Sequence, residues 1–219
     1  MKKFWSILAA SVLVLGTAGF AGADQLITAA DIPSGNPISV NIGTYATISS
    51  SSGGLDTKTV AGWTGIGVHG GVDGEIDVIG GKEFVSIGYA QPQVIDYITI
   101  GFLFKTGNYG DNVNEAAVFG PSGLLGLLTV VDGYNASWSG IGTVTNLSQG
   151  LNSYAGVWRI DHPFGVNVQE LTFSAGAYEG AQDGSNSDFS IVAVKTPEPL
   201  SMILTGLGLL GLAVLRRKD

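Results

Sequence analysis

The chain of 219 residues contains no cysteine, which excludes disulfide bonds, cysteine nucleophiles and thiolate metal sites. It has two histidines, His69 and His162, and no Gly-x-Ser-x-Gly segment, so nothing indicates a serine hydrolase triad. Basic residues are scarce, with 10 Lys and Arg against 18 Asp and Glu. An acidic chain of this kind repels nucleic acid and anionic lipid, so we expect no nucleic-acid partner.

The shortage of positive charge is greater in the middle of the chain than at its ends. Five of the basic residues lie near the two termini, at Lys2, Lys3, Arg216, Arg217 and Lys218. Residues 24–196 keep five Lys and Arg against sixteen Asp and Glu, a net charge of −11. The two apolar ends also raise the mean hydropathy, which is +0.32. Residues 24–196 therefore predict one soluble domain that is long enough to bury a core.

The N-terminal stretch has the three parts of a secretory signal peptide. Lys2 and Lys3 supply a positive start, and residues 4–20 are mostly apolar. Ala21-Gly22-Ala23 then gives the small-x-small pattern at which signal peptidase cuts. We expect residues 1–23 to direct export through the Sec translocon and the mature chain to begin at Asp24.

The C-terminal stretch, residues 197–219, also has three parts in a fixed order. Pro197-Glu198-Pro199 is held extended by its prolines. Residues 200–215 carry no charge and predict a transmembrane helix, slightly short of the ~20 residues of a full span. The basic residues Arg216, Arg217 and Lys218 would remain on the cytoplasmic side. The pattern indicates a weak C-terminal anchor with the body outside.

This tail resembles the PEP-CTERM sorting signal of Gram-negative bacteria. The match rests on Pro197-Glu198-Pro199, the apolar helix and Arg216-Arg217-Lys218, in that order at the end of the chain. The resemblance implies that an exosortase, a membrane transpeptidase-like enzyme, recognises the tail and cuts near the motif. The protein would then be anchored transiently in the inner membrane before reaching the cell surface or extracellular matrix. An ordinary single-pass anchor is the alternative.

Between the two signals the pattern is that of an all-β domain. Gly and Ser recur every ten or so residues, and β-branched and aromatic residues fill the intervals. Residues 38–48 predict the first clear strand, and residues 94–104 predict a long central strand. Residues 62–71 predict a loop, and residues 75–89 predict a hairpin around Gly80-Gly81. We expect a single antiparallel β-sandwich, jelly-roll-like, with an immunoglobulin-like sandwich as the alternative.

Acidic residues identify a candidate calcium site. Asp73, Glu75 and Asp77 alternate, so a strand would place all three on one face, where like charges need solvent or a cation. Gly74-Glu75-Ile76-Asp77 and the Asp188 segment are similar to the layout of jelly-roll carbohydrate-binding modules. In that layout an early acid and an Asp near the last strand share a structural calcium ion. We take Glu75, Asp77 and Asp188 as candidate ligands.

Asp111, in the polar stretch 107–114, is a candidate ligand in a second oxygen-rich loop. The alternative for both acidic stretches is a solvated turn that binds no ion.

Aromatic residues in loop-like stretches identify a candidate glycan platform, because the apolar face of a sugar stacks on an aromatic ring. Tyr134 and Trp138 lie in the stretch 132–140, and Tyr109 lies in the polar loop 107–114. The alternative for each ring is packing in the core or at its rim.

These patterns leave three functional hypotheses. The first is a non-enzymatic, exported protein with a structural or adhesive role among extracellular polysaccharide. The second is a calcium-braced carbohydrate-binding module for exopolysaccharide. The third is an envelope glycosidase with paired carboxylates, which has the least support because some pair will always be close among sixteen acids.

Overall fold

The computed structural model describes residues 24–78, 82–108, 114–149, 156–174 and 188–197. Leu26–Thr196 forms one compact unit, and the account below concerns that unit. Its elements are β1 (Gln25–Thr28), the short 3-10 helix η2 (Ala29–Asp31), β2 (Ser39–Ile42), β3 (Ala46–Ser50), β4 (Leu55–Val60), β5 (Trp63–Val68), β6 (Phe84–Gln93), β7 (Tyr97–Gly101), β8 (Ala116–Gly120), β9 (Gly126–Val130), β10 (Ala136–Trp138), β11 (Thr143–Asn146), β12 (Trp158–Asp161), β13 (Val168–Ser174) and β14 (Ser190–Thr196).

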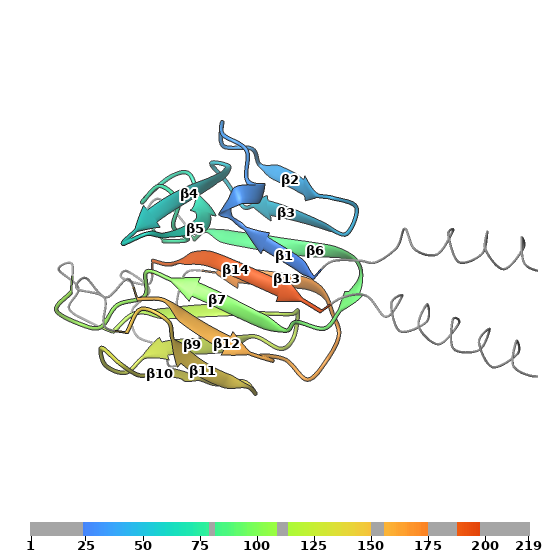
Figure 1. Cartoon of the computed structure of the whole chain (residues 1–219). Helices are drawn as coiled ribbons and strands as arrows, with labels where there is room; N and C mark the ends of the chain where they lie inside the picture. Colours follow the sequence, from blue (N-terminus) through green and yellow to red (C-terminus); the bar gives the residue numbers. More distant parts are fainter. Residues whose placement is uncertain (1–23, 79–81, 109–113, 150–155, 175–187, 198–219) are drawn as a thin grey trace, which may run out of the picture. The chain divides into compact units, whose positions relative to one another are not determined.

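The strands form two antiparallel sheets of seven strands each (Figure 1). In the first sheet the order is β11-β12-β7-β14-β5-β4, and β1 pairs with β14. In the second sheet the order is β10-β9-β8-β13-β6-β3-β2. Strands late in the chain lie between early ones, because β14 sits between β7 and β5, and β13 between β8 and β6. The all-β expectation is therefore confirmed.

One hydrophobic core joins the two sheets. Strand alternation turns Ile48, Ile87 and Phe173 of the second sheet inward, and each is fully buried. Ile98 and Ile100 of β7 face them from the first sheet and are fully buried as well. β7 lies between β12 and β14, which confirms the central strand expected within residues 94–104. β7 spans only Tyr97–Gly101, so the strand is shorter than expected.

Three local expectations are wrong. The expected loop 62–71 contains β5, which pairs with β4 from Leu55↔Val68 to Val60↔Trp63. The expected first strand 38–48 is a hairpin of β2 and β3 that turns at Gly43, where φ is +54°. Within the described residues the two arms of the expected hairpin 75–89 do not pair as strands, because Glu75 bridges Val68 and Ile76 bridges Phe189. One backbone hydrogen bond, from the Glu83 N–H to the Asp77 carbonyl (3.0 Å), joins the arms, and the expected turn at Gly80-Gly81 lies outside the described residues.

Of the sorting tail, Pro197 is the one residue that the structure describes. Pro197 follows β14 directly and is exposed, whereas the expected transmembrane helix 200–215 lies outside the described residues, as does the signal peptide. Within the described ranges, no helix has the length and apolar character needed to cross a membrane.

Candidate functional site

Two isolated β-bridges hold the acidic segment 73–77, one to Val68 of β5 and one to Phe189, which directly precedes β14. The Val68 N–H donates to the Glu75 carbonyl (2.8 Å), and the Ile76 N–H donates to the Phe189 carbonyl (2.7 Å). Because Ile76 pairs with Phe189 in the antiparallel sense, Asp77 lies across from Asp188. The bridge therefore brings the predicted ligands Glu75 and Asp77 next to Asp188, although among the described residues their carboxylate oxygens do not form a group within 4.8 Å of one another.

A glycine makes the close approach of this segment sterically allowed. Gly74 has φ +78°, and a Cβ atom there would lie 2.5 Å from the Thr57 carbonyl carbon of β4. The Gly74 carbonyl in turn accepts a hydrogen bond of 2.5 Å from the Ser190 hydroxyl of β14. A larger residue at position 74 would push the acidic segment away from both strands.

The carboxylates of this segment are buried and outnumber the nearby cations. Glu75, Asp77 and Glu83 are only 3%, 2% and 5% exposed, and Asp188 is half-buried. The Glu83 carboxylate accepts the Asp77 N–H (3.0 Å), and the Asp77 carboxylate accepts the Val72 N–H (2.6 Å). We call Glu75, Asp77, Glu83 and Asp188 the acidic cluster.

Lys58 is the cation that contacts Glu75, at 2.8 Å from Nζ to Oε2. Burial nevertheless raises the pKa of Glu75 to about 7, because desolvation outweighs the hydrogen bond and charge of Lys58. The neighbouring charges of Asp188 and Asp77 raise this pKa further. Burial also raises the pKa of Glu83, with a further contribution from Asp77. Calcium takes oxygen ligands of this type, but the described acidic and histidine side chains whose ligand atoms lie within 4.8 Å of one another belong to a different group.

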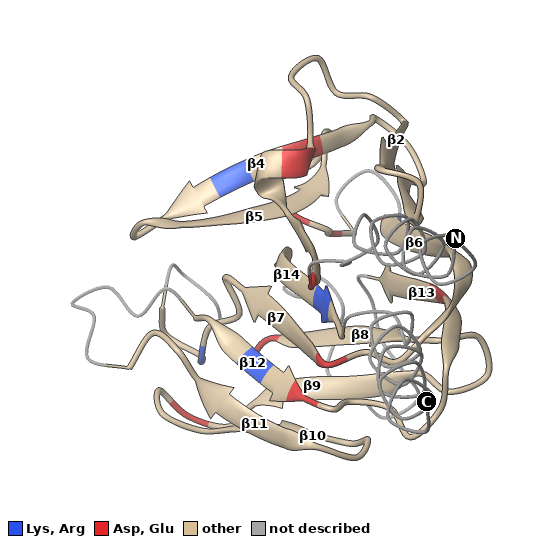
Figure 2. Ribbon diagram, turned by 45° about the vertical axis from the view of Figure 1, so that its right-hand side comes forward, with Lys and Arg blue, Asp and Glu red and all other residues tan. Residues whose placement is uncertain are grey.

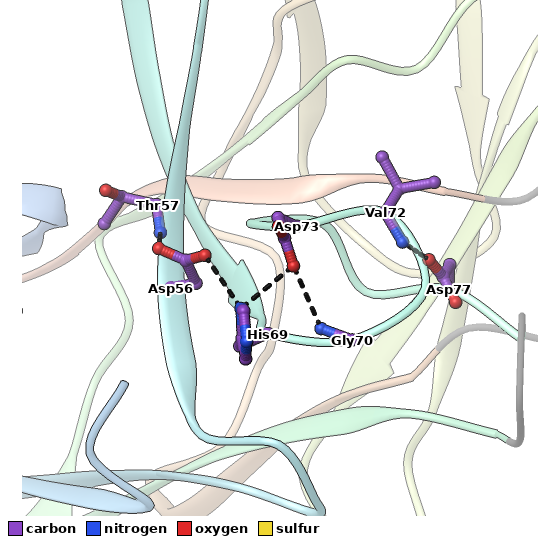
Figure 3. Close-up of polar contacts among 7 residues, drawn as sticks. All are labelled: Asp56, Thr57, His69, Gly70, Val72, Asp73 and Asp77. Atoms are coloured by element: carbon purple, nitrogen blue, oxygen red, sulfur yellow. Dashed lines mark hydrogen bonds and ion pairs between the residues drawn. The ribbon is translucent and has the colours of Figure 1, made fainter. Parts of the chain in front are cut away.

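A second group of charged side chains lies at the exposed end of the β4–β5 hairpin (Figure 3). His69 Nδ1 is 2.9 Å from an Asp73 carboxylate oxygen and 3.4 Å from an Asp56 carboxylate oxygen. Their ligand atoms lie within 4.8 Å of one another, which is compatible with a divalent metal. Ion pairing to His69 explains the same geometry. Sequence reasoning missed this group because the pairing of β4 with β5 brings Asp56 next to His69.

The loop that carries Tyr134 is held in one shape by hydrogen bonds. The Asp132 carboxylate accepts the N–H groups of Tyr134 (2.7 Å) and Asn135 (2.8 Å) and the side-chain amide of Asn135. These bonds, the Asn135 side chain first, hold the pKa of Asp132 below its usual range. The Asn146 side chain donates to the Gly133 carbonyl (3.3 Å). Tyr134 is 55% exposed at the end of this braced loop.

Trp138 lies in β10 and packs against the core. Its ring stacks on Phe119 at 4.6 Å between centroids and meets Phe164 edge-on at 6.3 Å. Gly126 and Gly140 lie so close to the indole that a Cβ atom on either residue would collide with it. The indole Nε1 is buried. This packing assigns Trp138 to the core rim and leaves Tyr134 as the exposed ring of the pair.

The two other predicted site residues, Tyr109 and Asp111, lie outside the described residues. Of the sorting motif, only Pro197 is described. Comparison of the chain with protein-family models, with curated proteins and with solved structures returns no match.

Proposed function

We propose that the chain is an exported, exosortase-processed protein of the cell surface or extracellular matrix, with a structural or adhesive role and no catalysis. The observation that carries the proposal is the ordered tail, with Pro197-Glu198-Pro199 followed by sixteen uncharged residues and then by Arg216-Arg217-Lys218. An N-terminal signal peptide over residues 1–23 supports export. The producing cell would be a Gram-negative bacterium.

The position of Pro197 supports processing of a folded body. β14 ends at Thr196, which is buried, and Pro197 is exposed immediately after it. Cleavage near the motif would therefore leave every strand of both sheets intact. For the fold we propose a jelly-roll arrangement, supported by the insertion of β13 and β14 between earlier strands.

Processing can be tested in a Gram-negative host with and without an exosortase. The full chain should lose the apolar helix only when the enzyme is present, which mass spectrometry of the product would detect. A variant with Pro197→Ala and Pro199→Ala should stay full-length and membrane-bound. Control substitutions at Ser201 should be processed normally. Processing of the double-alanine variant at the normal rate would refute recognition of the motif.

A calcium-braced carbohydrate-binding module is the second candidate. The specific observation in its favour is that the Ile76–Phe189 bridge places Asp188 next to the buried Glu75 and Asp77. Calcium bound there would neutralise buried carboxylates and hold the start of the acidic segment to β14. The braced, exposed Tyr134 would supply the sugar-stacking ring.

A further inference from the structure

The two sheets differ in the charge that their strands carry. In the first sheet, β4, β12 and β14 carry acidic and basic residues, whereas β2, β6, β8 and β9 of the second sheet carry none (Figure 2). Glu170 of β13 is the one acidic or basic residue in the seven described strands of the second sheet. A nearly uncharged sheet is unexpected in a body with a net charge of −11.

Many outward side chains of this sheet are hydroxyl and amide groups in register, beside the exposed ring of Phe84. The pairing Ser39↔Ser49, Ser49↔Ser86 and Ser86↔Thr172 places four hydroxyls in one row across β2, β3, β6 and β13. Their inward neighbours, such as Ile48 and Ile87, are fully buried, so the row faces away from the core. Because neighbouring strands lie ~4.8 Å apart, the row spans about 14 Å.

A second row runs parallel to the first, with Asn41 opposite Thr47, Thr47 opposite Gly88, and Gly88 opposite the exposed Glu170 of β13. The Thr47 hydroxyl donates to the Asn41 side-chain carbonyl (2.9 Å), which orients both groups. Gly88 leaves a gap in this row, because no atom lies within 4 Å of where its Cβ would be. The gap belongs to an open hollow that also includes Gly43, Thr44 and Ala90. The two rows and the hollow form the hydroxyl face.

We propose that the hydroxyl face binds a neutral polysaccharide chain lying across β2, β3, β6 and β13. Hydroxyl and amide groups both donate and accept hydrogen bonds, as the hydroxyls of a sugar do. The described strands of this sheet hold no Lys or Arg, and Glu170 lies at the end of the second row, so the face would repel an anionic polymer and suits an uncharged one. A second copy of this chain fits less well, because the two rows offer no large apolar side chains to bury.

This site is separate from the Tyr134 loop. The proposal rests on the proposed function and deepens it, because a neutral polysaccharide bound to the hydroxyl face would hold the protein in its matrix. Its failure would leave export and tail processing untouched, since these depend on other residues.

The test is affinity electrophoresis of the full chain in a sugar-free nonionic detergent. Native gels would contain dextran, galactomannan or a β-glucan as neutral probes, and alginate as an anionic control. Gly88→Gln fills the hollow with an uncharged side chain, and the Gly88 backbone needs no positive φ. The matched control is Thr145→Gln, at an exposed hydroxyl on β11 of the other sheet. Melting curves would verify that both variants fold.

We expect at least one neutral polymer to retard the wild type and Thr145→Gln. Gly88→Gln should bind it about tenfold more weakly, and Ser86→Ala or Thr172→Ala about fivefold more weakly, as expected for one lost hydrogen bond. No retardation by any neutral polymer would overturn the proposal, and so would retardation by alginate alone. Retardation that survives Gly88→Gln but is lost in Tyr134→Ala would also overturn it, and would place the glycan at the Tyr134 loop.

Discussion

Replacement of Glu75 by glutamine tests whether the buried negative charge of the acidic cluster destabilises the fold. The side chain is 3% exposed and contacts Lys58 at 2.8 Å. Glutamine keeps the size and shape of the side chain but cannot ionise. Lys58 is 31% exposed, so water can solvate its charge when the partner becomes neutral.

The magnitude follows from the raised pKa of Glu75, which moves from 4.5 to about 7 on folding. Because this carboxyl holds its proton more tightly in the folded protein, raising the pH through that window favours the unfolded state. The loss begins above the unfolded pKa and is complete above the folded pKa. At about 1.4 kcal/mol per pKa unit, the shift is worth roughly 3 kcal/mol.

Thermal unfolding of the full chain, depleted of metal ions, would measure this effect at pH 5 and pH 8. For a domain of this size, 1 kcal/mol moves Tm by about 2–4 °C. The Tm of the wild type should therefore be about 10 °C lower at pH 8 than at pH 5. Glu75→Gln should lose far less and should be the more stable protein at pH 8. Glu170→Gln, which changes an exposed acid on the other sheet, is the matched control and should behave as the wild type.

Calcium gives the same experiment a second readout. At one hundred times its dissociation constant, a ligand adds about 2.7 kcal/mol of stability. Calcium should therefore restore the wild type at pH 8 and leave Glu75→Gln nearly unchanged. Equal pH slopes for the wild type and Glu75→Gln would refute the burial argument. An equal rise of Tm with calcium in both proteins would remove Glu75 as a ligand.

Three further predictions concern packing and the exposed ring. Phe173→Ala empties a fully buried site and should destabilise the fold by about 3–5 kcal/mol in denaturant titrations. Gly74→Ala should lower Tm by several degrees, because the Cβ would lie 2.5 Å from the Thr57 carbonyl carbon at a positive φ. Tyr134→Ala should leave Tm unchanged, since the ring is exposed, and should weaken polysaccharide binding in a pull-down if the second candidate function holds.

Local sequence pattern was sufficient for the fold class and for the central strand. β7 lies inside its sheet between β12 and β14, and its core-facing residues Ile98 and Ile100 belong to an apolar run that is visible in the sequence. β5 was missed because Gly65 and Gly67 have the composition of a loop. Within the structure these glycines admit close neighbours, and a Cβ at Gly65 would lie 2.4 Å from the Ser190 Cβ. Glycine content alone does not distinguish a loop from a crowded strand.

The candidate sites were predictable to different degrees. The alternation of Asp73, Glu75 and Asp77 indicated a charged face, but the burial of Glu75 depends on Gly74 and on β14, which only the fold brings together. Glu83 was not anticipated, because it reaches the acidic cluster through the Asp77 N–H. The hydroxyl face could not be predicted either, since serines far apart in the sequence become a row only through strand register.

The chain has no cysteine, so the contacts that hold its last strand are all non-covalent. β14 is held by its pairing with β7 and β5, and the Ile76–Phe189 bridge adds one contact just before it, beside the acidic cluster. A cross-link between segments distant in sequence stabilises most, because it closes the longest loop of the unfolded chain. A calcium ion shared by Glu75 and Asp188 would make such a link, and it would convert repulsion among buried carboxylates into coordination.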